Sequence, residues 1–297
     1  MKPKFDVGKA LGFAFEVVQA RPRAFVTLAV WTILYGAVLG AFQLQAVGDE
    51  MAAYLEMASG AGGTIGSEDE QLRVTGAYLS RLLPFMGVAL VLGILFECAW
   101  LRLFVRGQDD GFFPFRIGRD EGVFTLTGIL LGLILFGAML IVAIAAVVIT
   151  VLFATSGAAG EMLAGSLVVL VTFVMAGAFM VLFSPVLALG LLKGRISIGA
   201  GIRGARQIFW PLLGSFVVAV IASLMAAALY AGLIGVMPFD QAGQTTSGQT
   251  AGWPLLFVFY VIVQVIYHLP AIMMRGIASY AALQIDESNR PVSDTFS

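Results

Sequence analysis

The sequence predicts an all-α, polytopic membrane protein with six transmembrane helices and additional cytoplasmic interfacial helices. Of its 297 residues, 60% are hydrophobic and 12% are charged, whereas soluble domains contain about 45–50% apolar and about 25% charged residues. The mean hydropathy is +0.96. A compact body of this size would lack the polar surface to cover itself in water, so the excess apolar surface must face lipid. Composition therefore excludes an ordinary soluble globular protein.

Six apolar intervals are long enough to form transmembrane helices. A crossing needs about 20 apolar residues at a rise of about 1.5 Å each. The third interval is longer than the bilayer requires, so we expect that helix to tilt or to begin in the interface. The predicted spans are 24–46, 83–105, 123–153, 165–192, 209–236 and 254–274.

The basic residues predict the orientation of these spans. Lys and Arg gather in cytoplasmic segments of membrane proteins. With both termini inside, only Arg73 and Arg81 of the 17 basic residues lie outside, which leaves 15 on the cytoplasmic side or at its helix ends. We therefore expect a multi-pass protein of a bacterial-type inner membrane with both termini in the cytoplasm.

Short amphipathic segments precede some of the spans. Apolar residues fall on one helical face in 7–18 and again in 198–209, with charged residues off that face. A proline follows each pattern, at Pro22 and Pro211. A third and weaker segment covers 115–121. We expect each segment to form a helix lying in the membrane interface.

These segments suggest an internal repeat, in which an interfacial helix precedes a transmembrane hairpin. The units would be 1–106, 110–192 and 195–285, within a single transmembrane domain 1–285 that is followed by a polar tail, 286–297. The alternative is that any basic amphipathic segment before a span looks alike, without true repetition.

A family resemblance lies in the fourth and fifth spans and the segment between them. It is carried by Pro185 through Lys193, by Ile198-Gly199-Ala200-Gly201-Ile202-Arg203-Gly204-Ala205-Arg206, and by Phe209-Trp210-Pro211-Leu212-Leu213-Gly214. This stretch resembles the membrane domain of some bacterial glycerophosphoryl diester phosphodiesterases and related stand-alone six-span proteins of unknown function. The resemblance implies a multi-span helical membrane module. It carries over no catalytic residue, because that family's hydrolase activity resides in a separate soluble barrel domain without a counterpart here.

Residues typical of catalytic or cofactor sites are scarce. One cysteine, Cys98, and one histidine, His268, cannot supply a disulfide framework or the clustered ligands of a metal, haem or iron–sulfur site. The segment 199–204 matches G-x-G-x-x-G, but a transmembrane run precedes it where a dinucleotide site needs a strand. We read it as a small helix face that packs closely on another helix. We expect a non-enzymatic protein with no cofactor and no metal.

Basic residues on the interfacial segments predict contacts with lipid. Anionic headgroups are their nearest partners at a membrane surface, whereas nucleic acid is not expected because acidic residues are interleaved with the basic ones. The candidate headgroup contacts are Lys4, Lys9, Arg116, Arg119, Arg203 and Arg206.

Glu97 and His268 are informative polar residues within the predicted spans. Ionisable groups at the centre of a span are disfavoured by about 2.5–3.5 kcal/mol, so they usually face protein or water. Counted from Arg102 and Arg275, the two residues lie at similar depth. They could pair in a proton-linked or ligand-coordinating site. The candidate site is Glu97, His268, Gln264 and Tyr267.

Two structural explanations compete with such a site. Glu97 and His268 could form a structural hydrogen bond, or Glu97 could reach Arg102, Arg106 or Arg275 near the end of the span.

Small residues within the spans have two possible packing partners. Glycines four residues apart, in 36–40 and 128–132, allow close helix packing, either within the chain or along a homodimer seam.

Two function classes follow from these observations. The leading hypothesis is a membrane module that binds or organises lipid or a membrane-embedded partner, since no segment carries the residues of an enzyme. The alternative is a small transporter or permease with a polar site around Glu97 and His268.

Overall fold

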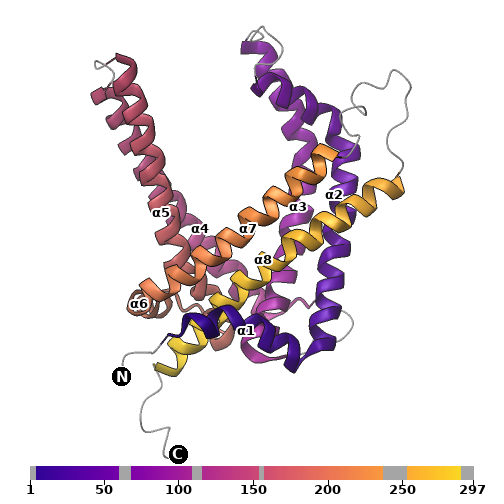
Figure 1. Cartoon of the computed structure of the whole chain (residues 1–297), viewed down its shortest axis with the longest axis vertical. Coiled ribbons are helices and arrows are strands. Elements are labelled where there is room, and N and C mark those ends of the chain that lie inside the picture. The colour runs from indigo at the N-terminus through magenta and orange to yellow at the C-terminus, as the bar shows by residue number, and fades with distance from the viewer. Residues whose placement is uncertain (1–4, 60–67, 109–115, 154–156, 237–252, 289–297) are drawn as a thin grey trace, which may run out of the picture.

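The structure, a computed structural model, describes residues 5–59, 68–108, 116–153, 157–236 and 253–288 (Figure 1). These residues form eight helices and contain no β-strand. The helices are α1 (Val7–Ala20), α2 (Pro22–Ser59), α3 (Glu68–Arg106), α4 (Arg119–Phe153), α5 (Gly157–Lys193), α6 (Ile198–Gln207), α7 (Phe209–Val236) and α8 (Trp253–Ser288).

Six of these helices, α2, α3, α4, α5, α7 and α8, are long and apolar enough to cross a membrane. Each predicted span lies within one of them. The prediction of an all-α fold with six spanning helices is confirmed, and these helices indicate a multi-pass membrane protein.

Helices α2 and α3 extend well beyond their apolar runs. Arg81 Nη1 of α3 lies 2.7 Å from Glu50 Oε1 of α2, and the rings of Tyr54 and Tyr78 stack with centroids 5.0 Å apart. An α-helix is held by its own backbone hydrogen bonds and can continue through polar sequence. The two cross-helix contacts hold these polar turns of α2 and α3 together.

The short helices α1 and α6 each directly precede a spanning helix, as predicted. Only Arg21 separates α1 from α2, and only Ile208 separates α6 from α7. Both short helices lie at the end of the molecule where α8 ends, the terminal end (Figure 1). There α1 runs across the ends of the long helices (Figure 1).

The third expected interfacial helix does not form as a separate element in the described part of 115–121. Residues 116–118 are not helical, and α4 already begins at Arg119. Glu121 Oε2 accepts a hydrogen bond from the Gly118 N–H at 3.0 Å, which satisfies a backbone group at the start of α4. Phe115 lies outside the described residues, and the three-unit repeat stays a prediction.

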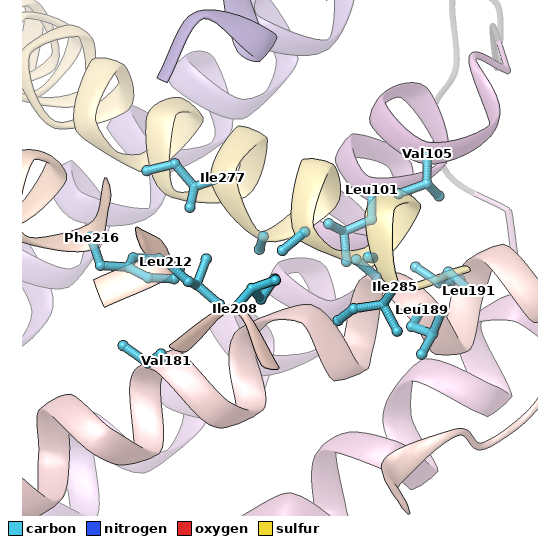
Figure 2. Packing of buried hydrophobic residues seen from close by; sticks show 14 of the residues in the cluster. Leu101, Val105, Val181, Leu189, Leu191, Ile208, Leu212, Phe216, Ile277 and Ile285 are labelled. Carbon is cyan, nitrogen blue, oxygen red and sulfur yellow. The ribbon is translucent and has the colours of Figure 1, made fainter. Parts of the chain in front are cut away.

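The packed core lies at the terminal end. Figure 2 shows buried side chains from α3, α5, α7 and α8, together with Ile208 between α6 and α7, in one cluster. The labelled members of this cluster are Leu101, Val105, Val181, Leu189, Leu191, Ile208, Leu212, Phe216, Ile277 and Ile285. Because Ile285 belongs to this core, α8 continues past the predicted span end at residue 274, and into the predicted tail as far as Ser288.

Away from the terminal end the helices diverge (Figure 1). Helices α4 and α5 pack on each other and form an arm that separates from α2, α3, α7 and α8. None of the most apolar 18 residues of α4 is buried. In a membrane this apolar surface faces lipid.

The glycines of the spans differ in their surroundings. A Cβ at Gly36 would lie 2.5 Å from Cδ of Gln264, and one at Gly40 would lie 2.5 Å from the Tyr260 ring. These glycines of α2 therefore allow close packing against α8 within the chain. Gly128 and Gly132 of α4 have no such neighbour within 4 Å of an added Cβ, and a homodimer seam there stays a prediction.

Candidate functional site

Ion pairs at the terminal end join neighbouring spanning helices. Arg102 of α3 pairs with Glu121 of α4, and both side chains are almost fully buried. Arg106 Nη1 lies 2.7 Å from Asp120 Oδ2, and its other terminal nitrogen donates to the Leu191 carbonyl of α5. A further pair, Lys193 and Asp286, joins α5 to α8 at 3.2 Å. Buried charges need such partners because an isolated charge is strongly disfavoured in an apolar interior.

The predicted candidate Glu97 takes part in one of these pairs. Its carboxylate oxygens both accept hydrogen bonds from Arg275 Nε at 2.9 Å, which ties α3 to α8. The alternative in which Glu97 reaches a basic residue near the span end is thus the arrangement observed.

Trp100 connects this ion pair to His268. The indole ring is completely buried, and its centroid lies 5.6 Å from Arg275 Cζ and 5.2 Å from the centroid of the His268 ring. Its Nε1 donates to Thr32 Oγ1 of α2 at 3.1 Å. Glu97 and His268 therefore lie in one cluster, with Trp100 and Arg275 linking them.

Two buried polar atoms of this cluster have no hydrogen-bond partner among the described residues. They are Nε2 of His268 and Nη1 of Arg275. His268 and Arg275 are seven residues apart, which places them on one face of α8. That spacing, together with a tryptophan at the matching depth of α3, is a signal that sequence reasoning could have used to find Arg275 and Trp100.

The other two predicted members contact different helices. Gln264 lies against Gly36 of α2, whereas the Tyr267 ring meets Tyr230 of α7 with centroids 5.7 Å apart. Successive residues of a helix are rotated by about 100°, so neighbours in the sequence of α8 point to different partners. The structure brings Glu97 and His268 into one cluster and directs Tyr267 toward α7.

A cavity of about 710 Å³ opens at the terminal end. This volume falls in the range of about 300–1,000 Å³ that is typical of small-molecule sites. Its walls come from the start of α1, the junction of α6 with α7, and the last turns of α8. The lining residues are Phe5, Asp6, Lys9, Gln207, Ile208, Pro211, Tyr280 and Gln284.

The polar side chains of this cavity are held in place by local contacts. Asp6 Oδ1 accepts the Lys9 backbone N–H at 3.1 Å and caps α1. The Phe5 and Tyr280 rings meet edge to face with centroids 5.3 Å apart. Gln284 lies one turn after Tyr280 and donates to Glu287 Oε2 at 3.3 Å. Amide, hydroxyl, carboxylate and ammonium groups thus meet beside apolar walls.

Of the predicted headgroup contacts, Lys9 lines this cavity and is exposed. Lys4 lies outside the described residues. Four further predicted contacts are exposed at the terminal end but do not line the cavity: Arg116, Arg119, Arg203 and Arg206. Sequence reasoning missed Asp6, Tyr280 and Gln284, because only the crossing of α1 over α8 brings them together.

Comparison with protein-family models, curated proteins and solved structures finds no match for this chain. Within the described residues, no group of three or more His, Cys, Asp and Glu side chains is arranged to hold a metal ion.

Proposed function

We propose that this chain is a non-enzymatic integral membrane module that binds or organises lipid. We further propose that it resides in a bacterial-type inner membrane with the terminal end in the cytoplasm. The observation that carries the proposal is the polar cavity beside α1, at the end where the basic residues gather. A membrane-embedded partner protein is the other occupant that the diverging helices could accept.

The depth of the cavity supports a headgroup as its occupant. Tyr280 and Gln284 lie five and nine residues beyond Arg275, roughly 8 and 14 Å along the helix axis. The headgroup layer adds roughly 5–8 Å on each side of the hydrocarbon core. Because α8 is inclined (Figure 1), the distance along the membrane normal is shorter. If Arg275 marks the edge of the hydrocarbon, the cavity lies at headgroup level.

The divergence of the helices supports the same proposal. The α4–α5 arm exposes apolar side chains along its length, including Phe136 and Phe173 at 69% and 75% exposure. Acyl chains of bound lipid can contact such a surface. Basic residues on α6 add an attraction for the anionic leaflet.

The test is mass spectrometry of lipids and proteins that co-purify with the chain in a mild membrane mimic. We expect retained phospholipid, and less of it after Gln284→Trp, which fills the cavity. Val265→Trp on the exposed face of α8 is the matched control and should retain the wild-type amount. A folded chain that retains no phospholipid, or equal retention in both variants, would contradict the proposal.

The alternative function is a small transporter or permease. It is favoured by the cluster of Glu97, Arg275 and His268, in which His268 Nε2 and Arg275 Nη1 are buried without a partner among the described residues. Such atoms could hydrogen-bond a translocated ligand or proton carrier.

A further inference from the structure

We infer that the cavity between α1, the α6–α7 junction and α8 selects a phosphoethanolamine headgroup, a phosphate ester that carries a primary amine. This inference rests on the proposed lipid-binding function and names the headgroup class that the cavity takes.

The charges of the lining suit a zwitterion. Among the eight lining residues, Asp6 and Lys9 are the charged ones, one of each sign. Lys9 attracts the phosphate, and Asp6 attracts the amine. A headgroup that carries only negative charge would gain the first contact but would be repelled by Asp6. The lining therefore favours a zwitterionic headgroup over an anionic one.

The hydrogen-bonding groups favour a primary amine over a quaternary one. An ammonium group has three N–H donors, and the cavity offers acceptors in the Asp6 carboxylate, the Tyr280 hydroxyl and the Gln207 amide. A quaternary ammonium has no donor and is usually held on the faces of aromatic rings. Here Phe5 and Tyr280 pack edge to face at an interplanar angle of 66°, so the edge of one ring covers a face of the other. That face cannot hold a quaternary ammonium group.

The apolar part of the lining indicates a lipid as the source of the headgroup. Phe5 and Pro211 are partly buried, and both form an apolar wall next to the polar residues. The glycerol backbone and the first methylenes of a phospholipid would fit this wall, and they have no equivalent in soluble phosphoethanolamine. We therefore assign the site to the lipid.

The experiment is a native mass spectrometry titration of the full chain in detergent. The probes are dioleoyl phosphatidylethanolamine, phosphatidylglycerol and phosphatidylcholine, which share their acyl chains, and soluble phosphoethanolamine. We expect phosphatidylethanolamine to bind about tenfold more tightly than the other two lipids. Soluble phosphoethanolamine should not displace it at equal concentration.

Two variants test the roles of Asp6 and Lys9 in headgroup binding. Asp6→Asn keeps an N-cap side chain, because Asn and Asp cap helices about equally well, and it should remove the preference over phosphatidylglycerol. Lys9→Gln should weaken the binding of all three lipids. Glu70→Gln, on an exposed position of α3 outside the cavity, makes the same charge change as Asp6→Asn and should leave the preference intact.

The possible failures are distinguishable. Equal binding of the three lipids, a preference for phosphatidylglycerol, or an unchanged preference in Asp6→Asn would overturn the headgroup assignment while lipid binding itself stands. Displacement of the lipid by soluble phosphoethanolamine would overturn the lipid as its source. If none of the lipids binds, both the inference and the proposed function are wrong.

Discussion

Trp100 shows how one residue connects the features of this protein. Its ring contacts Phe25 of α2, with centroids 5.1 Å apart, as well as His268 and Arg275 of α8. By sequence position it falls near the end of a span, where tryptophan commonly lies among headgroups. The structure buries it completely, because α1, α2 and α8 cover this part of α3. Trp210, also near a span end, is 77% exposed and fits the usual position.

At the residue scale, Glu97→Gln separates the two function classes. The change keeps the shape of the side chain but leaves Arg275 without its anionic partner. If the pair is structural, as we expect, the free energy of unfolding falls by about 1–3 kcal/mol. The double variant with Arg275→Gln should recover part of this loss, since neither charge is then unpaired. Thermal unfolding in detergent measures both effects.

A different result for Glu97→Gln would favour transport. In a working site the variant would keep its stability and lose a pH-dependent ligand response. Glu70→Gln, on an exposed residue of α3, is the control and should change neither quantity.

At the scale of the element, α6 is defined by its small face. A Cβ at Gly204 would lie 2.5 Å from Ile285 Cγ2 of α8, and one at Gly201 would lie 2.8 Å from Val186 Cγ2 of α5. Close helix packing thus explains Gly201 and Gly204, two of the three glycines in the match of 199–204 to a dinucleotide motif. A dinucleotide site needs a β-strand before this motif, whereas here the preceding element is the helix α5.

Alanine substitutions test this role of α6. Gly204→Ala should lower the free energy of unfolding by about 1–3 kcal/mol, the usual effect of overpacking. Gly199→Ala should change it by less than about 1 kcal/mol, because the nearest atom to an added Cβ there is Arg203 Nη1 at 3.6 Å. Chemical or thermal unfolding of the two variants checks the difference. Equal effects would show that the small face is not what the packing requires.

At the scale of the whole molecule, the terminal end holds the core, the ion pairs of Arg102, Arg106, Lys193 and Arg275, and the cavity beside α1. The proposed orientation puts this end in the cytoplasm. In a variant lacking Cys98, a cysteine at Arg203 should resist an impermeant thiol reagent on intact cells, whereas one at Arg73 should react. Permeabilised cells supply the control in which both react. Strong labelling at position 203 with none at 73, before permeabilisation, would reverse the topology.

The sequence by itself determined the membrane class, the six spans and the two short helices before α2 and α7. These features depend on local composition and periodicity. In the hydrocarbon core, an apolar segment satisfies the hydrogen bonds of its backbone by forming a helix. The sequence also limited the partners of Glu97 to a few residues, because depth along a span follows from residue number.

Only the tertiary structure decided which of these residues meet. Rotation of each helix about its axis is set by packing between helices, and it placed Trp100 between Arg275 and His268 while turning Tyr267 toward Tyr230. The cavity depends on α1 crossing α8, so Asp6 and Tyr280 meet although more than 270 residues separate them. Periodicity describes one helix at a time and contains no information on such crossings.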